Sequence, residues 1–128
     1  MELERLNRTN CRSYGKTDQP SITVTTKNGV IGFSKGAIEL IGLKLGDQVE
    51  FAIDKKDKSV FVLKSLKKEG FEIREHKSSK GFCFNNTVSA KRINELYAAE
   101  KQNVRYPLSL SPNNETGETM WLIINKQL

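Results

Sequence analysis

The sequence predicts a mainly β fold with two short helices, in which the order strand, strand, helix, strand, strand occurs twice. Three features of the 128-residue chain support this fold class. Apolar and polar residues alternate with a period of two in several short segments, glycine-containing turns separate those segments, and only two stretches place apolar residues at helical spacing. Four short strands and one helix bury too little surface to fold alone, so we expect both halves to share one core.

The first half begins after an N-terminal arm. Residues 1–19 carry many charges and almost no apolar periodicity, which predicts a flexible arm. The first unit then spans residues 20–68. Its β-branched run at 22–26 predicts a strand, Lys27-Asn28-Gly29 predicts a hairpin turn, and 30–33 predicts the returning strand.

A short helix follows the first hairpin. Ser34 is placed to cap it, Ala37, Ile38 and Ile41 share one face, and Gly42 can end it in a left-handed conformation. The remaining predicted elements of this unit are a Gly-Asp turn at 46–47, a strand at 49–53, a charged turn at 55–58 and a strand at 59–63.

The second unit spans residues 69–128 and repeats this order of elements. Its helix is capped within 85–87 and places Ser89, Ile93, Leu96 and Tyr97 on one face. The other predicted elements are a strand at 71–74, a turn at 76–81, a strand at 82–84, an alternating strand at 104–110, a turn at 111–117 and a strand at 120–124. The repeated order predicts an internal duplication.

The composition narrows the functional classes. With 37% hydrophobic and 28% charged residues, the chain is typical of a globular protein, and its net charge of +6 favours a polyanionic partner such as nucleic acid. Cys11 and Cys83 are too few for a disulfide framework and lack metal-ligand spacing. No signal peptide or membrane-spanning run is visible, so we expect a cytoplasmic protein that does not associate with membranes.

No combination of side chains predicts an enzyme, a metal site or a cofactor. The single histidine, His76, lies in a polar turn without catalytic partners, and Cys83 lies between two phenylalanines as a structural thiol. The carboxylates that could serve acid–base chemistry are assigned instead to turns and solvent faces: Asp47, Glu50, Asp54 and Asp57. Phosphate-binding glycine loops and paired zinc-binding cysteines are also missing from the sequence.

The first unit combines an Ile22-Thr-Val-Thr25 strand, a Gly-Phe-Ser34 helix entry and the segment Leu45-Gly-Asp-Gln-Val-Glu-Phe51. Over residues 22–64 it resembles the AbrB/SpoVT/MazE-type swapped-hairpin family, whose MraZ branch carries two such units in tandem. The resemblance implies a swapped-hairpin-like barrel, formed here by two pseudo-repeats in one chain. It also implies DNA binding, as a regulator or as an antitoxin. The chain departs from the family at Ser34, where proline is usual, and in the first hairpin, where the family often has arginine.

Seven basic residues form the predicted nucleic-acid-binding surface. Lys27 and Lys35 flank the first hairpin and helix start, and the corresponding region of the second unit contributes Arg74, Lys77, Lys80, Lys91 and Arg92. A pseudo-two-fold between the units would align all seven in one stripe for duplex DNA, with two helix N-termini adding amides for phosphate. The alternative is that they are independent surface side chains. The lysines of the 55–58 turn are mixed with aspartates and indicate a solvated turn.

Two other functions remain open. The aromatic side chains could stack on single-stranded DNA or RNA, with Trp121 as the reporter, although their alternating positions are more typical of a core. The chain could also be an antitoxin or another interaction module that binds a protein partner or forms a homodimer. Strands containing Phe61 and Trp121 are apolar on both faces, so each face is either buried or used for association.

Overall fold

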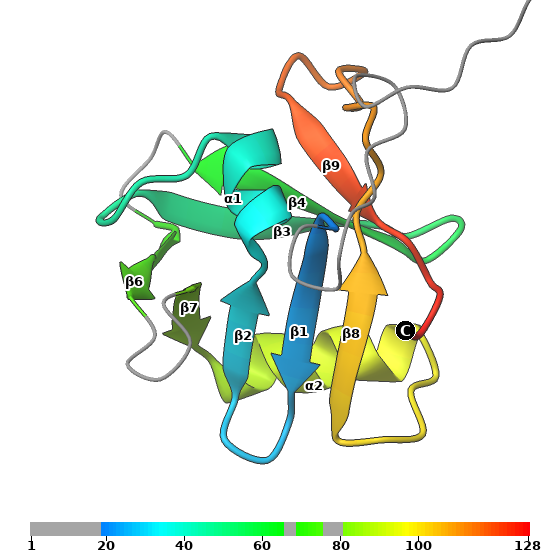
Figure 1. Ribbon diagram of the computed structural model, residues 1–128. Coiled ribbons are helices and arrows are strands. Elements are labelled where there is room, and N and C mark those ends of the chain that lie inside the picture. The colour runs from blue at the N-terminus through cyan, green and yellow to red at the C-terminus, as the bar shows by residue number, and fades with distance from the viewer. Residues whose placement is uncertain (1–18, 66–68, 76–80) are drawn as a thin grey trace, which may run out of the picture.

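Nine strands and two helices follow one another along the described part of the computed structural model, which comprises residues 19–65, 69–75 and 81–128. The first half contains β1 (Ser21–Thr25), β2 (Val30–Phe33), α1 (Lys35–Ile41), β3 (Gln48–Asp54) and β4 (Ser59–Ser65). The second half contains β5 (Phe71–Glu72), β6 (Arg74–Glu75), β7 (Phe82–Asn85), α2 (Thr87–Leu96), β8 (Asn103–Pro107) and β9 (Met120–Ile123). The predicted mainly β fold with two short helices is confirmed (Figure 1). Of the predicted arm 1–19, only Gln19 lies within the described residues.

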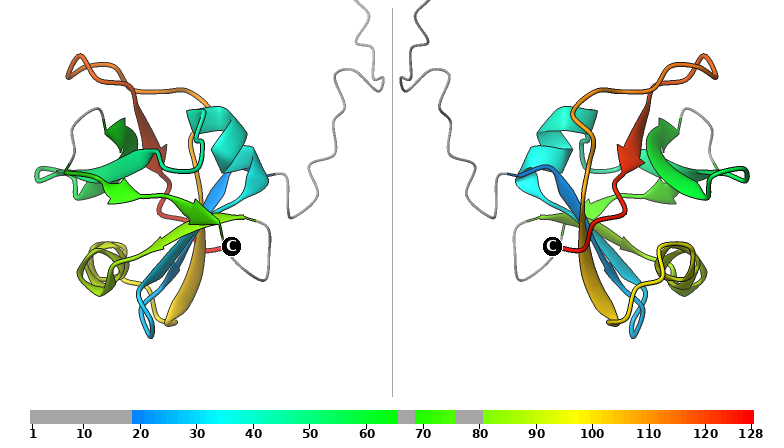
Figure 2. Two further views of the ribbon diagram at one scale, coloured as in Figure 1. Left: turned by 90° about the vertical axis from the view of Figure 1, so that its left-hand side faces the viewer. Right: turned by 90° about the vertical axis from the view of Figure 1, so that its right-hand side faces the viewer.

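The described strands form two antiparallel sheets. One has five strands in the order β6-β7-β2-β1-β8, and the other has four in the order β5-β3-β4-β9. Helix α2 crosses behind β2, β1 and β8, which leaves the opposite face of the five-stranded sheet toward the viewer (Figure 1). The side views place α2 on that one side of the sheet (Figure 2). The described strands do not make up one closed barrel.

The core lies between the two sheets and the helices. Alternate residues of β1 and β2 point into it, including Ile22, Val24 and Ile31, all of which are fully buried. The four-stranded sheet contributes Val60 and Ile123 from the opposite side. Each buried aliphatic side chain of this size stabilises the fold by about 1.5–3 kcal/mol relative to exposure.

Both helices begin at the side-chain caps that the sequence predicts. Ser34 Oγ accepts a hydrogen bond from Ala37 N at 3.1 Å and also accepts from Ser21 N at 2.9 Å, so the same hydroxyl joins α1 to β1. Asn86 Oδ1 accepts from Ser89 N at 2.8 Å at the start of α2. Gly42 ends α1 with φ of 78°, a left-handed conformation that favours glycine.

The single strand predicted at 71–74 is wrong, because the chain changes sheets at Ile73. β5 pairs with β3 in the four-stranded sheet, whereas β6 pairs with β7 in the five-stranded sheet. Between them, Ile73 N donates to Asp47 O at 2.8 Å and Ile73 O accepts from Gly46 N at 3.1 Å. These two bonds and the burial of the Ile73 side chain hold the crossing point against the Gly-Asp turn.

Two other predicted patterns also need correction. The alternating strand predicted at 104–110 ends at Pro107, and Leu110 is 67% exposed rather than part of that strand. The buried face of α2 consists of Ala90, Ile93, Asn94 and Tyr97, and the predicted Ser89 and Leu96 are only half-buried. Periodicity misses Asn94 because it is polar. Its Oδ1 accepts a hydrogen bond from Tyr106 Oη at 2.8 Å, whereas its buried Nδ2 has no hydrogen-bond partner among the described residues.

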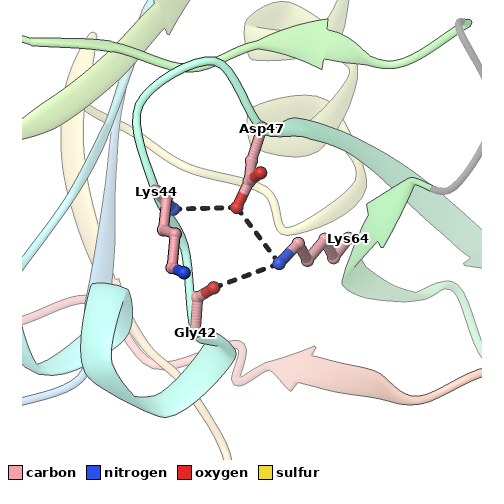
Figure 3. Close-up of polar contacts among 4 residues, drawn as sticks. All are labelled: Gly42, Lys44, Asp47 and Lys64. Atoms are coloured by element: carbon pink, nitrogen blue, oxygen red, sulfur yellow. Dashed lines mark hydrogen bonds and ion pairs between the residues drawn. The ribbon is translucent and has the colours of Figure 1, made fainter.

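The Gly-Asp turn at 46–47 has a structural role. Asp47 Oδ2 accepts from Lys44 N at 2.8 Å and lies 3.1 Å from Lys64 Nζ, which also donates to Gly42 O at 3.2 Å (Figure 3). Burial alone would raise the pKa of Asp47, but the Lys44 hydrogen bond and the Lys64 ammonium outweigh it and lower that pKa below its ordinary value. Asp54 and Asp57 similarly accept hydrogen bonds from backbone N–H groups in the β3–β4 turn.

Candidate nucleic-acid interface

A row of five residues crosses the whole five-stranded sheet on the side away from α2. The strand register pairs each member with its neighbour on the next strand, and the row reads Arg74, Cys83, Gly32, Thr23 and Arg105. Directly paired residues of an antiparallel sheet point to the same face. The neighbouring residues Ile22, Ile31 and Phe33 point into the core, so this row points outward.

We call this side the outer face of the five-stranded sheet. A second row contains the pairs Val30–Asn85 and Thr25–Asn103, and Ser21 extends the face toward α1. Most of these side chains are small and polar. A Cβ added at Gly32 would meet nothing within 4 Å, so the centre of the face is open. Among the outward-facing residues of these described strands there is no carboxylate, and an anion would meet only neutral or cationic side chains.

Arg74 is positioned at one edge of this face by a chain of amides. Its guanidinium donates to Asn85 Oδ1, and Asn85 Nδ2 donates to Asn28 O at 3.3 Å. Asn28 belongs to the β1–β2 turn, in which Lys27 is exposed. The chain therefore brings the Arg74 and Lys27 regions of the two halves to one corner of the sheet.

Arg105 is positioned at the opposite edge by β1. Its Nε donates to Ser21 Oγ at 2.8 Å. Ser21 is itself buried, and its backbone N–H donates to Ser34 Oγ. The half-buried Arg105 side chain is thus oriented across the outer face rather than extended into solvent. The row carries one cation at each end with small side chains between them.

The seven predicted residues do not all lie on this face. Lys27 and Arg74 lie at its corner, whereas Lys35 begins α1 beyond the other end of β2 (Figure 1). Lys91 and Arg92 are exposed on α2, which packs on the opposite side of the sheet. Lys77 and Lys80 lie outside the described residues, as does His76.

Arg92 has different surroundings from the two arginines of the outer face. It borders a hollow of about 320 Å³ between α2 and the four-stranded sheet. Phe51 and Phe71 line this hollow together with Glu69, and Glu50 borders it although the register of β3 turns its side chain to the other face of the sheet. An acidic residue beside Arg92 weakens the attraction of this region for a polyanion.

Sequence reasoning missed Arg105 as a candidate. The signal was nevertheless visible, because Arg105 alternates with the apolar Val104 and Tyr106 and must therefore point away from the core. Its significance depends on the pairing of β8 with β1, which joins residues more than 80 positions apart and cannot be derived from local patterns. The small residues of the row, Gly32 and Thr23, also indicate an open surface only when the pairing of their strands is known.

The other candidate groups are structural or lie outside the site. Cys83 is a buried free thiol within the row. Within the described ranges no three metal-ligating side chains cluster, and no described helix has the length and hydropathy needed to cross a bilayer. Trp121 packs against the core on β9, and its Nε1 has no hydrogen-bond partner within the described part of the chain.

Comparison with known proteins found no relative of this chain. The sequence matches no family model, and neither a curated protein nor a solved structure gives a significant match.

Proposed function

We propose that this chain binds duplex DNA through the outer face of the five-stranded sheet and acts as a non-enzymatic transcriptional regulator. The observation that carries the proposal is the row from Arg74 to Arg105, which has cations at both ends and an open centre at Gly32. Most hydrogen bonds between proteins and DNA go to phosphate and sugar, and arginine is the side chain best suited to bidentate phosphate contact.

The spacing of the two arginines suits a double helix. Adjacent strands lie about 4.8 Å apart, so the outermost strands of five are separated by about 19 Å. The major groove of B-DNA is about 12 Å wide and is bordered by two phosphate backbones. Arg74 and Arg105 can each face one backbone, while Thr23, Asn85 and Asn103 face the groove between them. Lys27 adds a third cation at the Arg74 corner.

We further infer that the two halves are pseudo-repeats with a swapped-hairpin arrangement. β2 pairs with β7 and β4 pairs with β9, so each of these strands pairs with its equivalent in the other half. In the order of elements, β5 is the equivalent of β1 and β8 is the equivalent of β3. Exchanging the two halves therefore turns the pair β1–β8 into the pair β5–β3, which is also present. Backbone bonds from Ser109 N to Leu122 O and from Ile124 N to Pro107 O connect the ends of β8 and β9. This pattern supports the resemblance to the AbrB/SpoVT/MazE-type family and its association with DNA.

The packing of Trp121 does not favour the single-stranded alternative. A stacking platform must offer an aromatic face to a base. The Trp121 ring lies instead on the core side of the four-stranded sheet, in one row with Phe51 and Val62. The outer face of the five-stranded sheet offers hydrogen-bonding and cationic groups instead. These groups suit contact with the phosphate backbone of a duplex, in which the bases are already paired.

The test is a fluorescence anisotropy titration of labelled duplex and single-stranded oligonucleotides over a salt series. We expect tighter binding to the duplex and a slope of log K against log salt of about −0.9 for each phosphate contacted. The Arg74→Gln/Arg105→Gln double variant should make that slope shallower by about 1.8. Lys91→Gln is the matched control, because this exposed lysine lies on α2, on the opposite side of the five-stranded sheet. An unchanged slope in the double variant would contradict the proposed surface.

A further inference from the structure

The outer face of the four-stranded sheet is apolar at its centre. Register places Ala52, Phe61 and Leu122 in one cross-strand row, and Glu50, Leu63 and Met120 in the next. Their chain neighbours Val60, Val62 and Ile123 point into the core, so these two rows point away from it. A polar outer face is the usual pattern for an antiparallel sheet with one buried side.

This apolar face is separate from the core of the molecule. The core cluster and the apolar side chains packed against it include Val60, Val62, Ile123, Phe51 and Trp121 from the inner face of this sheet, but no member of the two outer rows. Leu63 and Met120 are buried by their immediate surroundings, whereas the central row of Ala52, Phe61 and Leu122 keeps part of its surface accessible. Contiguous apolar surface of this kind marks an association site.

The charges at the two ends of this outer face have opposite signs. At one end, Glu50 and Glu72 point outward, because Glu72 pairs with the outward-facing Gln48. At the other end, the β3–β4 turn exposes Lys55, Lys56 and Lys58. The aspartates of that turn accept backbone hydrogen bonds, Asp54 from Lys56 N at 2.9 Å and Asp57 from Ser59 N at 3.0 Å. Three lysines against these two aspartates leave the turn with a net charge of +1.

We propose that this face is a dimerisation surface whose partner is a second copy of this chain. A two-fold axis lying in the interface, perpendicular to the strands, stacks the sheets face to face with their strands antiparallel. Phe61 and Leu122 of the two copies then meet at the centre, and the lysine turn of each copy lies over Glu50 and Glu72 of the other. Face-to-face sheets pack about 10 Å apart, which allows the central side chains to interdigitate.

A two-fold interface must be complementary to itself, and this charge pattern meets that requirement. The same patch brings an acidic end and a basic end, so the reversed copy satisfies both ends at once. A partner of uniform charge would be repelled at one end. The dimer also leaves the outer face of the five-stranded sheet uncovered, so its formation does not depend on the proposed DNA binding.

The first test measures the mass of the full chain by light scattering and sedimentation across a concentration series. The dimer has twice the 14.5 kDa mass of one chain. Phe61→Glu should reduce the mass to that of the monomer, because it places two carboxylates against each other at the two-fold axis. Val88→Glu is the control, since Val88 is 79% exposed on α2 and outside the interface. A wild-type chain that stays monomeric, or a folded Phe61→Glu variant that stays dimeric, would overturn the proposal.

Charge exchange provides a second test that leaves the apolar side chains untouched. The variants Lys55→Glu/Lys56→Glu and Glu50→Lys/Glu72→Lys should each lose self-association, because like charges meet at both ends. Mixed together, they should form a heterodimer, because each acidic end then faces a basic one. With one of the two variants labelled with nitrogen-15, native mass spectrometry of the mixture distinguishes the heterodimer from both homodimers by mass. Failure of the mixture to associate would overturn the antiparallel arrangement.

Discussion

The outer faces of the two sheets have opposite chemical character, although the inner faces serve the same core. On the five-stranded sheet the central outer row is Arg74, Cys83, Gly32, Thr23 and Arg105. On the four-stranded sheet it is Ala52, Phe61 and Leu122. Folding requires only that the inner residues of each strand be apolar. The outer residues are therefore free to reflect function, and they separate the surface that we propose for DNA from the surface that we propose for a second chain.

Local placement of charge matters more than total charge for this comparison. The chain carries +6, but the described residues contain thirteen basic and twelve acidic side chains. The described surface is thus almost neutral as a whole. Arg74 and Arg105 lie at the edges of the five-stranded sheet, whereas Glu50, Glu72 and Asp54 point outward from the four-stranded sheet.

The largest expected effect comes from giving each outer face the same new charge. Thr23→Glu places a carboxylate between Arg74 and Arg105, and we expect it to weaken duplex DNA binding about a hundredfold, because like charges brought together cost several kcal/mol. Ala52→Glu makes the equivalent change on the four-stranded sheet, where it should disrupt the proposed dimer but leave the DNA affinity of each chain unchanged. Anisotropy titrations at one salt concentration compare the two. Equal losses would mean that the faces do not differ in the way proposed.

The element order and caps of this chain could be predicted from sequence because they depend on local chemistry. Ser34 and Asn86 cap helices through bonds to residues three positions away, and Gly42 ends α1 through its own backbone. The candidate site could be predicted only in part. The Lys27 turn and the Arg74 strand come to one corner through the pairing of β2 with β7, and Arg105 lies on the same face through the pairing of β8 with β1. Such non-local pairings leave no trace in local periodicity, and this is also why the change of sheet at Ile73 was missed.

A second prediction concerns how α2 is joined to the four-stranded sheet. Tyr97 Oη accepts from Val60 N at 2.9 Å and also bonds to Ile123 O. Tyr97→Phe leaves these buried backbone groups without their partner, so we expect a loss of about 1–3 kcal/mol in the free energy of unfolding. Urea unfolding measures the loss, and hydrogen exchange at Val60 should accelerate. DNA affinity of the folded variant should not change, because Tyr97 lies on the core side of the five-stranded sheet, against Tyr106. A parallel loss of DNA binding would contradict that separation.

A third prediction concerns alkaline pH. Burial raises the pKa of Tyr106 to about 12, with a smaller contribution from Tyr97, and burial raises the pKa of Tyr97 as well. An unfolded tyrosine titrates near 10, so the folded chain keeps protons that the unfolded chain loses between these values. The stability these groups confer is present below about pH 10 and falls as the pH rises toward 12. Tyr106→Phe should flatten this decline in unfolding curves recorded at successive pH values. An equal decline in the variant would exclude Tyr106 as a cause.

The smallest expected effect concerns Asp47 at the end of the four-stranded sheet. Asp47→Asn removes an exposed ion pair with Lys64, and we expect it to cost about 0–1 kcal/mol of stability at neutral pH. Because the folded pKa of Asp47 is lowered, its contribution is present above the unfolded value near 3.9 and is lost as the pH falls through the folded value. The stability difference between wild type and variant should therefore shrink in acid. Thermal unfolding at neutral and acidic pH measures it, and a constant difference would contradict this role.

The central claim is that duplex DNA lies on the outer face of the five-stranded sheet, and an NMR titration of the isotope-labelled chain with a duplex oligonucleotide tests it most directly. We predict that the backbone amides of Thr23, Gly32 and Arg105, together with the Arg74 side chain, shift progressively. The amides of Ala52, Phe61 and Leu122 should remain unchanged by DNA. Shifts concentrated on the four-stranded sheet or on α2, with the Arg74 to Arg105 row unaffected, would contradict the account.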